Sequence, residues 1–240
     1  MVKDVYFTYL LGALFLFAGV AYAVRVAMRG VARSERVSRI GGTVMVGQEI
    51  MDWTYWSIEP IVRGLAALGV TANGLTWAAL ILGLGAGVAL GFDMFGLAAL
   101  LATASTFCDI FDGQVARLTK TGSNRGELLD AAIDRYTEFA FLAGLAFHYR
   151  ESPAELGLVL GALLACFMVS YASAKAEALQ VEPPRGLMRR HERAIYLITG
   201  VAVSSLFGLP VAALVALAIV AVVGNFAAIL RFVRIARALR

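Results

Sequence analysis

Apolar runs of about 20 residues recur along the chain and limit the folds that it can adopt. A helix needs roughly 20 apolar residues to cross the hydrocarbon core of a bilayer. Candidate spans lie at residues 6–24, 74–92, 94–117, 127–147, 154–178, 193–208 and 210–231. Hydrophobic residues make up 60% of the chain and charged residues only 16%, unlike the composition of a soluble domain. The sequence therefore predicts an all-α integral membrane protein.

Basic residues are distributed unevenly between the two sides of these spans. An odd number of spans places the termini on opposite sides, and four basic clusters then share one side. The positive-inside bias predicts insertion in the cytoplasmic (inner) membrane with the N-terminus outside and the C-terminus inside. Because the basic residues follow this membrane pattern, we expect no nucleic-acid partner despite the net charge of +4. The clusters are Arg25, Arg29, Arg33, Arg36 and Arg39; Arg117, Lys120 and Arg125; Arg185, Arg189, Arg190 and Arg193; and Arg231, Arg234, Arg237 and Arg240.

Two further segments indicate how helices are placed. The stretch from Gly47 to Gly69, GQEIMDWTYWSIEPIVRGLAALG, alternates indole and aliphatic side chains with charged ones. We expect it to form an amphipathic segment in the headgroup layer. In the second span, Gly83, Gly87 and Gly91 share one face, and small residues on a face let another helix approach closely.

Four aspartates interrupt the apolar pattern at the third and fourth spans. Asp109 and Asp112 lie three residues apart, and Asp130 and Asp134 lie four apart, so each pair shares one face of its helix. The connection between the two spans, TKTGSN, is short, which makes the helices antiparallel neighbours. We therefore expect the four carboxylates to converge at the cytoplasmic edge of the membrane.

Four converging carboxylates require cations, because like charges repel strongly where water is scarce. Sites made only of oxygen ligands suit Mg²⁺ or Mn²⁺, and two such ions would balance four negative charges. The alternative is that the aspartates cap helices or pair with Arg117, Arg125 and Arg135.

Two glycines lie beside the acids. Gly113 directly follows Asp112, and Gly126 lies one turn before Asp130, so both positions lack a side chain there. This leaves room for a bulky group against the backbone. A metal pair with such clearance suits a diphosphate substrate, whose oxygens bridge the ions.

The same residues carry a resemblance to the CDP-alcohol phosphotransferase family. Its signature, D-x2-D-G-x2-A-R-x8-G-x3-D-x3-D, is matched at every fixed position, from Asp109 to Asp134. The resemblance implies a six-helix membrane bundle, often a homodimer, to which the first span is an addition. The expected organisation is an extra transmembrane helix and basic linker (1–46), an amphipathic interfacial segment (47–70) and a six-helix catalytic membrane domain (71–240).

The resemblance also implies a role for each matched position. Two Mg²⁺ or Mn²⁺ ions would be held by Asp109, Asp112, Asp130 and Asp134, and Asp134 would also be the general base for the acceptor alcohol. The alcohol oxygen would attack the β-phosphorus of CDP-diacylglycerol, and CMP would leave. Thr71 or Asn73 would contact the nucleotide or only cap the second span. The implied nucleotide-binding residues are Thr71, Asn73, Asp112, Gly113, Ala116, Arg117 and Gly126.

Residues 170–197 resemble the corresponding region of prokaryotic phosphatidylinositol-phosphate synthases. The resemblance implies acceptor binding by Ser170, Lys175, Arg190 and Arg193. Ser173 departs from the pattern, because it stands where a phosphate-binding lysine is expected, and Arg189 replaces a glutamate. The acceptor is therefore inositol phosphate, with Arg189 restoring the charge, or a different alcohol such as free inositol or glycerol phosphate.

Other functions fit parts of the sequence. Within the family, these are a phosphatidylglycerophosphate or phosphatidylserine type of synthase and a transferase that moves a CDP-linked amino alcohol to diacylglycerol. A divalent-cation transporter would use the aspartates as its ion site, but transport sites usually lie near the bilayer midplane. The main prediction is an enzyme of phospholipid synthesis that joins CDP-diacylglycerol to a water-soluble alcohol among membrane lipids.

Overall fold

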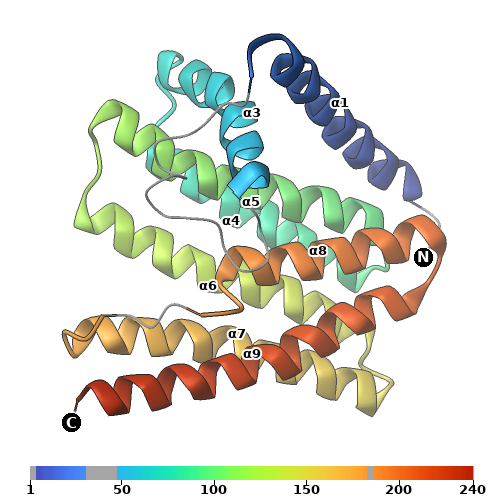
Figure 1. The fold of residues 1–240 in the computed structure, drawn as a ribbon. Helices are drawn as coiled ribbons and strands as arrows, with labels where there is room; N and C mark the ends of the chain where they lie inside the picture. The colour runs from blue at the N-terminus through green and yellow to red at the C-terminus, as the bar shows by residue number, and fades with distance from the viewer. Residues whose placement is uncertain (1–3, 31–47, 183–185, 240) are drawn as a thin grey trace.

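The computed structural model describes residues 4–30, 48–182 and 186–239, and within these ranges the chain forms eight helices and no strand (Figure 1). Predictions for Gly47, Arg33, Arg36, Arg39, Arg185 and Arg240 concern positions outside the described residues. The helices are α1 (Val5–Arg29), α3 (Gln48–Ala67), α4 (Ala72–Gly91), α5 (Phe95–Thr119), α6 (Asn124–His148), α7 (Pro153–Ala178), α8 (Arg190–Phe207) and α9 (Pro210–Ala238).

Each predicted span coincides with a helix. Among the described helices, α1, α4, α5, α7 and α9 are long and apolar enough to cross a membrane. The less apolar α6 and α8 carry charged side chains in their first turns, and α8 has only 18 residues. The prediction of an all-α integral membrane protein is confirmed.

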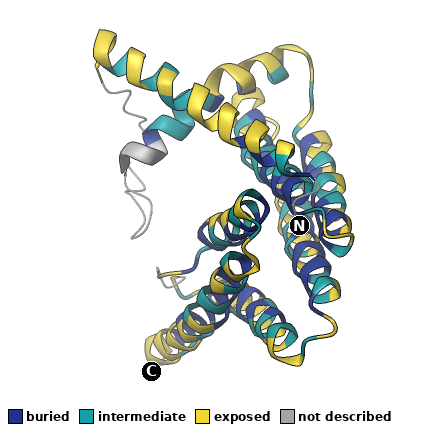
Figure 2. Ribbon diagram, turned by 90° about the vertical axis from the view of Figure 1, so that its right-hand side faces the viewer, coloured by how far each residue is buried: buried dark blue, intermediate teal, exposed yellow. Residues whose placement is uncertain are grey.

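The bundle consists of two packed groups of helices. In the first, α4 packs against both α5 and α6, and in the second α9 packs against α7 and α8; contacts of α5 with α8 and of α6 with α7 join the groups. The fully buried side chains of the shared core include Leu90, Phe95, Leu142, Leu145 and Leu217. The remaining helices, α1 and α3, pack on the outside of α5, and exposed residues run along most of α1 (Figure 2).

The predicted glycine face of α4 lies against α6. A Cβ atom on Gly87 would press against the carbonyl oxygen of Ala140, and one on Gly144 would press against the carbonyl oxygen of Gly87. A Cβ on Gly83 would collide with the side chain of Thr137. The absence of side chains thus lets the two backbones touch, and this contact fixes α6 beside the α4–α5 pair.

Replacing Gly87 with alanine is expected to lower the thermal stability of the purified protein. The new methyl group would meet backbone atoms that cannot rotate away, and overpacking of this kind costs about 1–3 kcal/mol. Thermal unfolding in detergent would measure the effect. Gly157→Ala in α7 is the matched control, because nothing lies within 4 Å of a Cβ there. Equal melting temperatures for the two variants would contradict the close contact of α4 with α6.

Candidate active site

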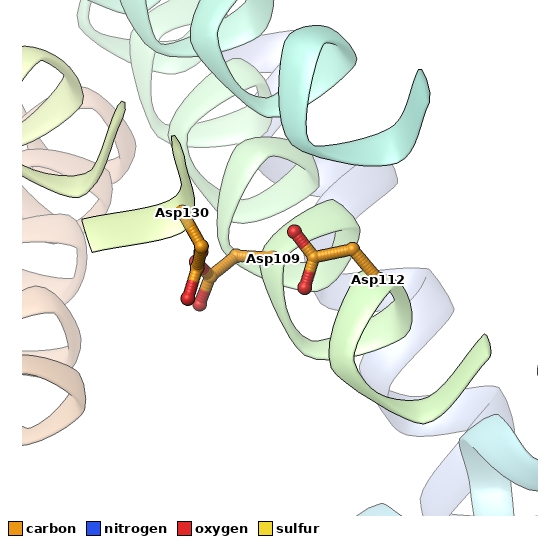
Figure 3. Close-up of side chains that lie close together, drawn as sticks. All are labelled: Asp109, Asp112 and Asp130. Atoms are coloured by element: carbon orange, nitrogen blue, oxygen red, sulfur yellow. The ribbon is translucent and has the colours of Figure 1, made fainter. Parts of the chain in front are cut away.

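The aspartates predicted from the sequence come together at one end of the bundle. Asp109 and Asp112 project from the last turns of α5, and Asp130 projects from α6 (Figure 3). One carboxylate oxygen from each of the three lies within 4.8 Å of the others. Asp112 is the most deeply buried of them, with 5% of its surface exposed. Such a group of oxygen ligands has the chemistry of a divalent metal site.

The turn between α5 and α6 sets the register of this group. Lys120 ends α5 in the left-handed conformation (φ 57°). Ser123 then caps α6, its Oγ accepting a hydrogen bond from the Gly126 N–H at 3.1 Å. The TKTGSN connection therefore reverses the chain within a few residues, and the carboxylates of two antiparallel helices face each other.

Two neighbouring side chains orient the carboxylates. The hydroxyl of Thr76, in the second turn of α4, donates to Asp112 Oδ2 at 2.7 Å. Arg190, the first residue of α8, donates through Nη1 to Asp109 Oδ2 at 2.7 Å. Its Nη2 lies 2.7 Å from Asp134 Oδ1, so one guanidinium group joins acids from α5 and α6. Of the charged partners predicted as an alternative, Arg135 lies 3.8 Å from Asp134.

The acid group fits a divalent cation. Asp130 Oδ1 is buried and has no hydrogen-bond partner among the described residues. An unpaired buried carboxylate oxygen is costly unless a cation or donor meets it. Arg190 bridges Asp109 and Asp134, and the part of the chain that the structure describes forms no ion pair with Asp112 or Asp130. Oxygen-only donors of this kind match Mg²⁺ or Mn²⁺ rather than a softer metal.

A cavity of about 860 Å³ opens on the α3–α4 side of the acids. Thr71 caps α4 by accepting from the Gly74 N–H at 3.1 Å, and its side chain also borders the cavity. The guanidinium group of Arg117 occupies the space beside Gly113, and a Cβ atom on Gly113 would lie 3.4 Å from it. The cavity is lined by every residue predicted for the nucleotide, namely Thr71, Asn73, Asp112, Gly113, Ala116, Arg117 and Gly126.

A second cavity, of about 720 Å³, opens on the α7–α9 side of the acids. Its wall includes Asp134 and three residues predicted for the acceptor, Ser170, Arg190 and Arg193. The fourth, Lys175, is exposed and does not line the cavity. The two cavities therefore meet the acid group from different sides.

The predicted site residues leave out two others: Arg231, which lines the second cavity, and Glu138, which holds the cavity residue Arg193. Glu138 accepts from Arg193 Nε at 2.9 Å and from Nη2 at 2.7 Å, and Arg193 is only 1% exposed. Arg231 of α9 donates to Ser173 Oγ at 2.9 Å and to the Leu187 carbonyl at 3.1 Å. Glu138 follows Asp134 by one helical turn, and this spacing is a signal that sequence reasoning could have used.

Comparisons with known proteins agree with this geometry. The family model for CDP-alcohol phosphatidyltransferase matches residues 69–230. The phosphatidylinositol phosphate synthase of Mycobacterium tuberculosis is 35% identical over 154 residues, which cover 60% of this chain and 69% of that protein. The chain belongs to the CDP-alcohol phosphatidyltransferase family, and it is therefore a membrane phosphotransferase.

Solved structures of the Mycobacterium tuberculosis enzyme share the fold. The structure with CDP-DAG bound superposes with a TM-score of 0.68 at 26% identity, covering 73% of this chain and 92% of that one. The structure in complex with manganese and citrate gives the same TM-score and identity and covers 87% of that chain. Metal-dependent transfer from a CDP-linked donor thus accounts for the acid group and for the cavity beside it.

Thr76→Val is expected to weaken Mn²⁺ binding about tenfold, because partners that orient metal-binding side chains typically contribute 10- to 100-fold in affinity. The substitution removes the hydroxyl that donates to Asp112 and nearly keeps the side-chain shape. Titration with Mn²⁺, followed by electron paramagnetic resonance of the free ion, would measure the change. In the control Thr103→Val, the lost hydroxyl bonds to the Ala99 carbonyl of its own helix. Unaltered affinity in Thr76→Val would show that metal binding does not depend on this donor.

Proposed function

We propose that this enzyme transfers the phosphatidyl group of CDP-diacylglycerol to inositol phosphate and releases CMP. The observation that carries the acceptor assignment is the cationic wall of the cavity beside Asp134. A phosphate monoester brings nearly two negative charges at neutral pH and prefers arginine partners. The name and bound donor of the Mycobacterium tuberculosis relative support the same pair of substrates. The cationic residues of the wall are Arg135, Arg189, Arg190, Arg193 and Arg231.

The departure at Ser173 fits this assignment. A serine there removes one cation from the pattern of phosphatidylinositol-phosphate synthases, and Arg231 lies against its hydroxyl at 2.9 Å. The Nε atom of Arg231 is buried and has no partner among the described residues. Arg231 therefore offers a positive charge and a free N–H donor next to the position of the lost lysine. This supports a phosphorylated acceptor over free inositol.

The four aspartates would hold two Mg²⁺ or Mn²⁺ ions. Asp109, Asp112 and Asp130 form one group of ligands, and Asp134 lies one turn beyond Asp130 along α6. Such ions, when bound, neutralise the diphosphate and acidify the hydroxyl of the acceptor. Thr76 keeps Asp112 in its rotamer, and the backbone around Gly113 and Gly126 leaves the nucleotide cavity open.

In this proposal, one cavity binds the CDP-linked donor and the other binds the acceptor alcohol. Asp134 lies at the border of the acceptor cavity and would take the proton of the attacking hydroxyl. The new bond joins the alcohol oxygen to the β-phosphorus, and the bond from that phosphorus to the CMP oxygen breaks. Arg190, held by Asp109 and Asp134, would orient the acceptor, and Arg193 is fixed behind it by Glu138. Lys175, which is exposed, would contact the acceptor only from outside the cavity.

We also propose the membrane arrangement predicted from the sequence: an inner-membrane protein, surrounded by lipid, with its site facing the cytoplasm, its N-terminus outside and its C-terminus inside. Arg117 lines the same cavity as Asp112 and Asp130, and Arg190 and Arg231 line the cavity that Asp134 borders, which supports this orientation. We retain the division into residues 1–46, 47–70 and 71–240. A homodimer is proposed by likeness to the family.

Release of CMP from CDP-diacylglycerol is expected with inositol phosphate and not with inositol, glycerol 3-phosphate or serine. Parallel assays of the purified protein with Mg²⁺ or Mn²⁺ would test this. Release with glycerol 3-phosphate or serine alone would assign the other synthase types, and release from CDP-choline with diacylglycerol would assign amino-alcohol transfer.

The Arg231→Gln variant should raise the KM for inositol phosphate about tenfold, the loss expected for one charge-assisted hydrogen bond. Arg237→Gln, an exposed position on the same helix, is the control.

Asp134→Asn is expected to lower kcat by about 100- to 10,000-fold, the usual contribution of a general base. CDP-diacylglycerol binding should persist, because the donor cavity is lined by other residues. Turnover and donor binding would be measured on the same preparation, with Glu151→Gln at an exposed site as control. Activity near that of the parent would remove Asp134 from the role of base.

A further inference from the structure

Helix α1 lies outside the residues that match the family, yet it is fixed to the catalytic helices. At its start, Asp4 is 1% exposed, and its Oδ2 accepts from the Leu97 N–H at 2.7 Å. Leu97 lies in the first turn of α5, so Asp4, which directly precedes α1, caps the helix that carries Asp109 and Asp112. Gly96 allows this approach, since a Cβ there would press against the Asp4 carbonyl oxygen. The amino end of α1 is therefore held against the amino end of α5.

Further along, α1 meets α3 through four aromatic side chains, which we call the aromatic seam: Phe15, Tyr22, Trp53 and Trp56. The Trp53 indole N–H donates to the Ala18 carbonyl of α1 at 3.2 Å. The ring centroids of Phe15 and Trp53 are 6.4 Å apart, and those of Tyr22 and Trp56 are 5.3 Å apart. Contacts of this type hold two helices in one relative orientation.

The other end of α3 forms part of the donor cavity. Val62 of α3 is buried against Leu75 of α4 and Val115 of α5, and Val115 lies between Asp112 and Ala116 in the sequence. Beyond this contact, Ala66 at the end of α3 lines the cavity, followed by Gly69 and Val70. A shift of α3 would therefore move part of the wall of the cavity that Arg117 also lines.

We propose that α1 positions α3 through the aromatic seam and thereby sets the affinity of the donor cavity for the cytidine diphosphate part of the substrate. Trp53 and Phe15 are positioning residues that act through α3 and not on the reacting atoms. The inference rests on the proposed function for the identity of the donor. It assigns a role in substrate binding to a helix that precedes the family domain.

The test compares the full-length parent with Trp53→Leu and with Trp77→Leu, a half-exposed tryptophan on α4. KM would be measured for CDP-diacylglycerol, for water-soluble CDP-glycerol and for the acceptor, together with kcat. Trp53→Leu should raise the KM of both CDP donors about threefold to tenfold, the range expected for losing one aromatic pair. The acceptor KM and kcat should stay within about twofold of the parent. Trp53→Phe, which keeps a ring against Phe15, should restore most of the donor affinity.

A change confined to CDP-diacylglycerol would overturn the inference, because it would mean contact with the acyl chains. Equal losses for donor and acceptor, or no loss, would also overturn it. If Trp53→Leu does not fold, Phe15→Leu changes the seam from the α1 side and carries the same expectation. Equilibrium binding of CDP-diacylglycerol separates the two proposals: a parent that does not bind it refutes the proposed function as well, whereas equal binding by parent and variant refutes only the role of α1.

Discussion

The gathering of carboxylates at one end of a membrane-protein bundle is the constraint on which the rest of the structure depends. Like charges in a poorly hydrated site repel, so the fold must hold them together and supply positive charge. The glycine contact between α4 and α6 holds the carboxylates together, because it fixes α6 where Asp130 faces Asp109. Arg190 supplies part of the positive charge by bridging Asp109 and Asp134. The remaining charge is what makes the site suitable for a divalent cation.

The acids also separate two chemically different cavities. The cavity proposed for the donor is bordered by the amino end of α4 and by glycines, which suit a nucleotide and its diphosphate. The cavity proposed for the acceptor is bordered by arginines from α6, α8 and α9, which suit a second phosphate. A transferase that joins two anionic substrates needs this division, because each substrate must be neutralised before their reacting atoms can approach.

The sequence predicts the features that local spacing determines. The pairs at Asp109–Asp112 and Asp130–Asp134, the cap at Thr71 and the apolar spans all follow from helical periodicity or from turn chemistry. Contacts between distant segments do not follow in this way. Arg190 reaches Asp109 across 81 positions, and Asp4 caps a helix 93 positions away. Such pairs depend on how helices pack, which periodicity leaves open.

The arginines illustrate why residue type alone is ambiguous in a membrane protein. Arg190, Arg193 and Arg231 belong to clusters that the positive-inside rule explains completely, and that explanation needs no specific contact. The structure distinguishes them by burial. Arg193 and Arg231 are 1% and 6% exposed, and each has several acceptors, whereas Arg237 on the same helix as Arg231 is exposed. A buried arginine loses its hydration and persists only where partners or a ligand replace it. Arginine can therefore serve to orient the protein in the bilayer where it is exposed, and to bind an anionic substrate where it is buried.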